Sequence, residues 1–237
     1  MRSVLRLLRF VSEFLRATPT QLNAWVKEHP RQLTAFCVGA IMVSAGAYGG
    51  AMGSWSNGLQ SCYTGIKLPL AILLTTLGNG LLNGMVAPLL GAPVTFRQSL
   101  ALVLVSFVIT AMILGALSPV ALFVIWNTPA LSTATHETSP EYGFMQLTIA
   151  GFIALAGVMG NVRLFPLLRE WTGRTSVALQ VLLAWLAGNL FLGSQICWLL
   201  RPFIWDPTGR MEFIGSQYLH GSFFETLWEA ARRLLFS

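Results

Sequence analysis

The chain has little charge, and its longest apolar runs have almost none. Only 10% of its 237 residues are Asp, Glu, Lys or Arg, against about 25% in an average soluble domain. About 20 apolar residues in a helix cross the roughly 30 Å hydrocarbon core of a bilayer. The sequence therefore predicts an all-α, polytopic integral membrane protein with about five transmembrane helices. These segments are 33–53, 68–90, 99–126 and 176–200, which carry no charge, and 145–168, which carries only Arg163.

The residues that usually perform chemistry are also scarce. Asp206 is the single aspartate, and no predicted span contains Asp, Glu or His. The three histidines have no metal-ligand spacing, and no P-loop, GxSxG or HExxH motif is present. The cysteines Cys37, Cys62 and Cys197 form no CxxC pair, so a disulfide framework is not expected. We therefore expect a non-enzymatic protein without a metal or cofactor, and the lack of intramembrane carboxylates disfavours ion-coupled transport.

The net charge of +6 does not point to nucleic acid, because the basic residues flank the apolar segments instead of forming one patch. Ten of the 15 would be cytoplasmic if the N-terminus were inside. The positive-inside rule therefore favours a cytoplasmic N-terminus and, with five spans, an external C-terminus. The basic C-terminal tail would fit better if one segment were re-entrant. The ten are Arg2, Arg6, Arg9, Arg16, Lys27, Arg31, Arg97, Arg163, Arg169 and Arg174.

Both ends of the chain are predicted to be amphipathic. In residues 1–32 one helix carries a polar stripe beside a wide apolar face, which is typical of a helix in the membrane interface. Packing under the bundle and an organellar targeting peptide are the alternatives. Thr18 and Gln21 form a capping box that starts a second short helix, and the tail 201–237 carries another amphipathic helix from Ser222. The predicted lipid-contacting arginines of the stripe are Arg2, Arg6, Arg9 and Arg16.

Small residues four apart recur in three predicted spans. Such pairs allow two helix backbones to approach closely. They predict packing inside the bundle, with the face of a homo-oligomer as the alternative. The residues are Gly46, Gly49, Gly50, Gly53, Gly80, Gly84, Ala184 and Gly188.

The polar side chains inside the spans are amides and hydroxyls. They usually join helices by hydrogen bonds, although a polar pocket, a lipid-headgroup site or a permeation path would use the same residues. The amides are Asn79, Asn83, Gln180, Asn189 and Gln195. Trp198 and Arg201 follow, where the last span meets the interface, and they are expected to anchor it or to contact a lipid or partner.

The sequence also predicts the connections between the helices. Residues 54–67 are predicted to be a loop, with Pro69 starting the second span. Thr95 and Gln98 form a capping box, so the second and third spans should be an antiparallel hairpin. The fourth span fades at 160–163, and Gly173 should end the short helix that follows.

Four short runs carry a resemblance to a family of bacterial multi-span proteins related in architecture to the Yip1-like membrane proteins. They are KLPL at 67–70, TFRQSL at 95–100, Ser118–Pro119 and GSQICWLLRPF at 193–203, within a likeness covering about residues 33–225. The resemblance implies a five-span fold and a location in a bacterial inner membrane. It implies no particular activity, and the role of eukaryotic Yip1 proteins in trafficking with small GTPases is not carried over to this chain.

The function expected from these features is that of a non-enzymatic membrane scaffold or accessory subunit of a larger assembly. Its expected partners are membrane lipids and other membrane proteins, and a homo-oligomer is possible. A small transporter or channel that uses the intramembrane amides is the first alternative. A membrane-shaping protein that acts through its amphipathic ends is the second.

Overall fold

The computed structural model describes residues 11–55, 58–92, 95–129 and 140–200, together with Phe213, Phe224, Glu225, Trp228 and Arg232. The fold is all-α, as the composition predicted, and no strand occurs in these ranges. The helices are α2 (Pro19–Glu28), α3 (Pro30–Gly53), α4 (Gly58–Leu89), α5 (Phe96–Trp126), α6 (Pro140–Val162), α7 (Phe165–Thr172) and α8 (Thr175–Leu200).

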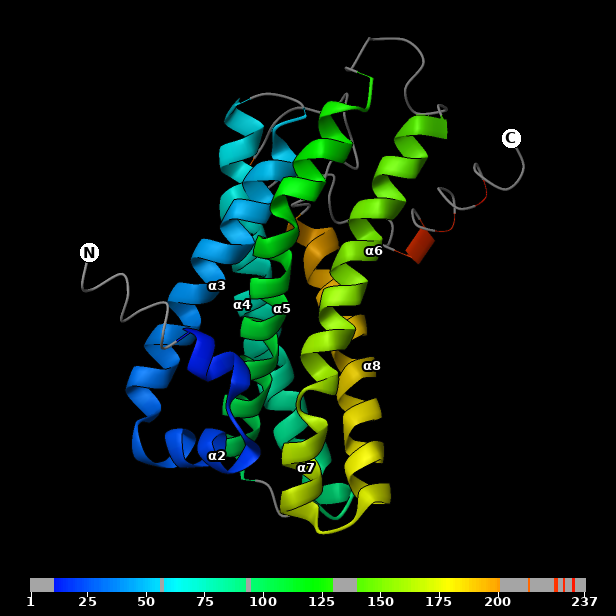
Figure 1. Cartoon of the computed structure of the whole chain (residues 1–237). Coiled ribbons are helices and arrows are strands. Elements are labelled where there is room, and N and C mark those ends of the chain that lie inside the picture. Colours follow the sequence, from blue (N-terminus) through cyan, green and yellow to red (C-terminus); the bar gives the residue numbers. More distant parts are fainter. Residues whose placement is uncertain are drawn as a thin grey trace, which may run out of the picture.

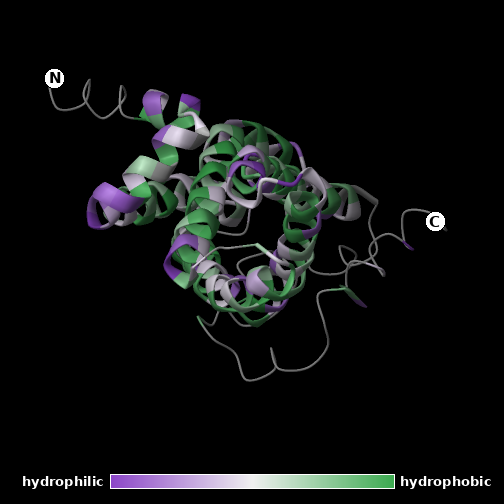
Figure 2. Cartoon of the chain, turned by 90° about the horizontal axis from the view of Figure 1, so that it is seen from below, coloured by the Kyte–Doolittle hydropathy of each residue, from purple (hydrophilic) through white to green (hydrophobic). Residues whose placement is uncertain are grey.

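Five helical stretches of the described chain are long and apolar enough to cross a membrane, which confirms the expected helical bundle. They contain α3, α4, α5, α6 and α8. Figure 1 shows these helices running roughly side by side, with α2 across the axis at one end and α7 at the same end. Figure 2, viewed along the axis, shows mostly hydrophobic spans. α5 is the most buried span and contacts α3, α4 and α6.

The predicted loop at 54–67 is largely wrong. α4 begins at Gly58, so Pro69 lies inside the helix and is buried instead of starting it. Tertiary packing explains the extension, because the first turns of α4 lie against α3. There the Ser61 hydroxyl donates a hydrogen bond of 2.7 Å to the Gly50 carbonyl. The prediction followed the apolar segment 68–90, whereas α4 begins ten residues earlier, where it packs against α3.

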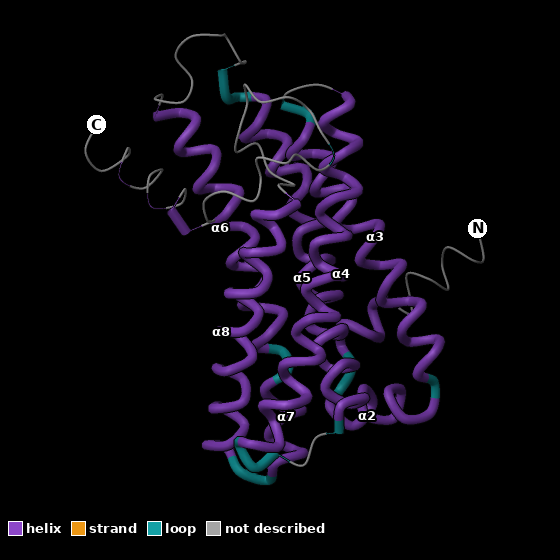
Figure 3. Tube along the Cα trace, turned by 180° about the vertical axis from the view of Figure 1, so that it is seen from behind, coloured by secondary structure: helices purple, strands orange, loops and turns teal. Residues whose placement is uncertain are grey.

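The predicted fourth span, 145–168, is two helices. α6 begins at Pro140 and ends at Val162, and α7 begins after a turn at Arg163 and Leu164. The predicted fading at 160–163 therefore marks a real break. Gly173 caps α7 in the left-handed conformation with φ of 65°, which confirms the predicted helix end, since glycine adopts that conformation without steric cost. The tube in Figure 3 shows the same break between α6 and α7 from behind.

The connection between α4 and α5 is an antiparallel hairpin, as predicted. The capping box of α5 is present, with Thr95 Oγ1 accepting from the Gln98 backbone N–H and the Gln98 side chain accepting from the Thr95 N–H. The corresponding box of Thr18 and Gln21 begins α2.

The described part of the N-terminal region packs against the bundle. Phe14 is 2% exposed and lies against Trp25 and Phe36, with ring centroids 6.3 and 5.3 Å away. The Arg163 guanidinium donates to the Leu15 carbonyl, which ties the N-terminal segment to the break between α6 and α7. Residues 11–28 therefore pack against the bundle, which was the alternative to a helix in the membrane interface. Arg16, one of the predicted lipid-contacting arginines, is exposed. Arg2, Arg6, Arg9, Arg201 and most of the predicted C-terminal helix lie outside the described residues.

Candidate functional site

The glycine stripe of α3, which is Gly46, Gly49, Gly50 and Gly53, packs against α4 inside the bundle. A Cβ added to Gly49 would strike the carbonyl oxygen of Thr64, and one added to Gly53 would lie 2.5 Å from the Gln60 carbonyl oxygen. At Gly46 it would lie 3.3 Å from the Gly65 carbonyl oxygen. These backbone contacts cover the stripe with α4. The homo-oligomer alternative therefore does not apply to these glycines.

The other predicted small residues lie in two further helix contacts, α4 with α5 and α4 with α8. A Cβ at Gly80 or Gly84 would strike the Leu100 or Phe96 side chain of α5. Gly188 of α8 faces α4 instead, because its Cβ would lie 3.4 Å from the Asn79 Oδ1. Ala184, one turn earlier on α8, is half-buried. Sequence reasoning missed Gly160, where a Cβ would lie 2.6 Å from the Ser106 carbonyl oxygen of α5.

Two of the predicted amides form an internal polar patch between α4 and α8. Asn79 and Asn83 are 0% and 2% exposed, and both lie near Gly188. Neither polar atom of the Asn79 amide has a hydrogen-bond partner among the described residues, and the Asn83 nitrogen also lacks one. Burying such groups without partners costs free energy. Both amides lie in the seam between α4 and α8.

The remaining amides lie on different faces of α8. Asn189 donates a hydrogen bond of 2.8 Å from its Nδ2 to the Oδ1 of Asn161 on α6. Asn161 in turn donates from its Nδ2 to the Gly157 carbonyl at 2.8 Å. Gln180 is exposed and Gln195 is half-buried, so Gln180 does not share the polar contact that Asn189 makes with α6. Asn161 was missed, although an amide in an apolar segment was the signal used for the others.

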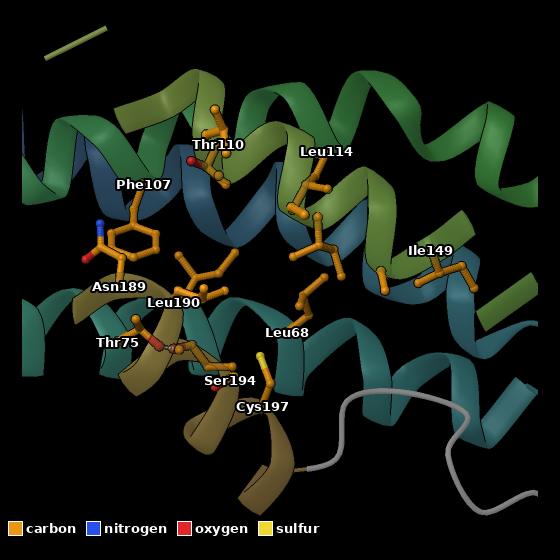
Figure 4. A pocket seen from close by; sticks show the side chains of 18 of the residues that line it. Leu68, Thr75, Phe107, Thr110, Leu114, Ile149, Asn189, Leu190, Ser194 and Cys197 are labelled. Carbon is orange, nitrogen blue, oxygen red and sulfur yellow. Dashed lines mark hydrogen bonds between the residues drawn. The ribbon is translucent and has the colours of Figure 1, made fainter. Parts of the chain in front are cut away.

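A cavity of about 500 Å³ lies between α4, α5, α6 and α8, within the 300–1,000 Å³ range of ligand pockets. Met52 of α3 and Phe224 of the C-terminal region also line it. In Figure 4 labelled side chains from all four helices surround one space. The Asn161–Asn189 pair lines its end nearest α7, and Met145 and Cys197 line the part near the start of α6 and the end of α8. Most of the lining is aliphatic or aromatic, and it contains no charged residue and no histidine among the described side chains. Its polar residues are Thr75, Thr110, Gln146, Asn161, Asn189 and Ser194.

The cavity opens toward the side of the bundle between α6 and α8. Val158 on α6 and Leu190 on α8 both line it, yet they are 43% and 61% exposed. The opposite wall is closed, because Leu68 and Leu114 also line it and are 2% and 1% exposed. The mouth therefore faces the surface that the bilayer would cover.

A buried cation lies near the start of α4. Lys67, expected at the membrane boundary, is 2% exposed, and its Nζ lies 5.3 Å from the centre of the Phe213 ring. Tyr63 meets the same ring edge to face at 5.7 Å. Trp198, the predicted anchor, is half-buried on α8. Sequence patterns gave no sign of the Lys67 contact, because Phe213 lies far away in the chain.

The described residues contain no group of three or more His, Cys, Asp or Glu side chains that could hold a metal ion. Fold and cavity together define an all-α membrane protein with an apolar chamber between its spans. Searches of protein-family models, of curated proteins and of solved structures found no match to this chain. The resemblance to the Yip1-related bacterial family therefore stays a prediction.

Proposed function

We propose that this protein is a non-enzymatic membrane protein that binds a lipophilic molecule between its spans. The observation that carries the proposal is the apolar cavity with its mouth between α6 and α8. A chamber of this size is a standard ligand site, and its lining offers neither a nucleophile activated by a base nor a charged group. Binding and not chemistry is what such a lining supports.

Gly157 offers a direct test of ligand binding. It lines the cavity, and a Cβ added to it would meet no atom within 4 Å. A phenylalanine side chain there would occupy part of the chamber, and its Cβ would strike no neighbouring atom. We expect one lipophile to co-purify with the parent protein in mild detergent at a fixed ratio, and we expect Gly157→Phe to lose it. Extraction followed by mass spectrometry measures the ratio.

The matched control is Gly151→Phe on the same helix. Gly151 also has no atom within 4 Å of its added Cβ, but it is exposed and does not line the cavity. This variant should keep the lipophile. A parent protein without an enriched lipophile, or equal retention by both variants, would refute the proposal.

The purification also tests the role of scaffold or accessory subunit, which stays a prediction from the sequence. Stoichiometric partner proteins at native mass would support it, and a lone chain or homo-oligomer would move the transporter and membrane-shaping alternatives forward. Transport would require that Asn83→Leu abolishes flux while the bundle stays folded. Membrane shaping would require that deletion of residues 1–17 changes vesicle binding or curvature.

We further propose a bacterial inner-membrane location with the N-terminus in the cytoplasm. The resemblance to bacterial multi-span proteins supports the location, and the basic end formed by α2, α7 and the α4–α5 turn supports the orientation. By the positive-inside rule this end is cytoplasmic. It carries Lys27, Arg31, Arg97, Arg163, Arg169 and Arg174.

Thiol labelling tests this orientation. Cys62 is exposed in the first turns of α4, near the opposite end. In intact spheroplasts a membrane-impermeant maleimide should label Cys62. With Cys62→Ser as the background, Arg174→Cys should be labelled only after permeabilisation. The reverse pattern would invert the orientation.

A further inference from the structure

We infer that the occupant of the cavity is one acyl chain of a membrane lipid, which enters sideways between α6 and α8 while the headgroup stays at the surface. The inference rests on the proposed function and names its ligand. Three properties of the cavity lead to it: the place of its mouth, the hydrogen bonds of its lining, and the difference between its two ends.

The mouth decides which molecules reach the cavity. Val158 and Leu190 form exposed parts of its lining on two spanning helices. The medium at this depth of a bilayer is hydrocarbon. The molecules that stand beside the mouth at the highest concentration are therefore the acyl chains of the surrounding lipids.

The hydroxyls of the lining already donate to the protein backbone. Thr75 donates to the Ala71 carbonyl at 2.7 Å, Thr110 to the Ala156 carbonyl at 3.2 Å, and Ser194 to the Phe191 carbonyl at 2.9 Å. A polar ligand buried here would lose its own hydrogen bonds without an equal return. A hydrocarbon chain loses none, so the lining selects for one.

At the end nearest α7 the amide donors are used in the same way, whereas the Oδ1 of Asn189 accepts no hydrogen bond from the described residues. The Nδ2 of Asn189 donates to Asn161, and the Nδ2 of Asn161 donates to the Gly157 carbonyl. This pair links α6 to α8 across the cavity and closes that end. The tip of the chain would therefore lie against Thr75 and Asn189, which Figure 4 shows at the same end of the space.

The other end suits the polar part of the lipid. Gln146 lines the cavity two turns after the start of α6, and it is half-buried. Its amide can donate to an ester carbonyl where the chain joins the headgroup. We therefore place the headgroup on the side where α6 begins and α8 ends.

Photo-crosslinking tests the assignment. The full chain is reconstituted in vesicles of phosphatidylethanolamine and phosphatidylglycerol. One sample contains a phosphatidylethanolamine with a diazirine at the middle of one acyl chain. A second contains the same lipid with the diazirine on the headgroup. After irradiation, peptide mass spectrometry locates the labelled residues.

We expect the chain probe to label residues of the closed wall, which bulk lipid does not reach. Leu68, Thr75 and Leu114 are 2%, 3% and 1% exposed and report this labelling. It should be lost in Gly157→Phe and kept in Gly151→Phe. Both variants should keep the general lipid labelling of Val43 on α3, which is 75% exposed. The headgroup probe should label none of the three wall residues.

The possible failures are distinct. If the chain probe labels only outward-facing residues while a lipophile still co-purifies and is lost in Gly157→Phe, the cavity binds another class of molecule and this inference is wrong. Wall labelling by the headgroup probe would also overturn it. If no lipophile co-purifies and the wall is unlabelled, the proposed function fails with it.

Discussion

Gly49→Ala should destabilise the bundle by about 1–3 kcal/mol, the usual cost of forcing extra atoms into a packed site. The added methyl group would strike the Thr64 carbonyl oxygen and would lie 3.1 Å from the Leu68 Cβ. Backbone atoms have no alternative rotamer, so α3 and α4 must separate. In the membrane this close packing, and not the hydrophobic effect, holds the helices together. Thermal unfolding in mild detergent, followed by size-exclusion chromatography, measures the change.

Gly39→Ala on the same helix is the matched control. Gly39 is exposed, and an added Cβ would meet no atom within 4 Å. It should keep or raise the stability, since alanine favours a helix over glycine by about 0.8–1.0 kcal/mol. If both variants gained stability alike, the close approach of α3 and α4 would not exist in the protein.

Trp185→Ala should cost about 3–5 kcal/mol, the range found for removal of a large aromatic side chain from a core. Trp185 on α8 is 0% exposed and is one of the largest fully buried side chains of the described chain. Its removal would leave a cavity whose lining atoms lose their contacts. Unfolding by titration with sodium dodecyl sulfate in mixed micelles measures the loss.

Trp126→Ala provides the comparison for that variant. Trp126 ends α5 and is 73% exposed, so its removal leaves no internal cavity and should change the stability by well under 1 kcal/mol. Equal losses for the two variants would mean that Trp185 does not belong to the packed core.

Local signals in the sequence predicted the starts of α2 and α5 and the end of α7. Thr95 with Gln98, and Thr18 with Gln21, are capping boxes that the structure contains. Gly173 ends α7 as expected. These predictions succeed because a cap depends on a few neighbouring residues. The predicted start of α4 was wrong. Residues 58–67 are helical and pack against α3, and no local sequence pattern reports that contact.

The candidate site was only partly predictable. The apolar spans, the glycine pairs and most of the amides were visible in the sequence. Their partners were not, because residues four apart share a helix face without revealing which helix they meet. Asn79 and Asn83 pack in the α4–α8 seam, whereas Asn189 reaches Asn161 on α6. The cavity was not predicted, since it arises from four helices that are distant in sequence.

By itself the sequence determined that this protein is a helical membrane bundle. The lack of charge over 20 or more residues leaves few soluble alternatives, and a helix satisfies its own backbone groups in lipid. Tertiary structure decided how the helices face one another. It placed the glycine stripe against α4, buried Lys67 and left an opening between α6 and α8. The physical reason is that helix formation is local along the chain, whereas packing depends on surfaces that only the folded bundle brings together.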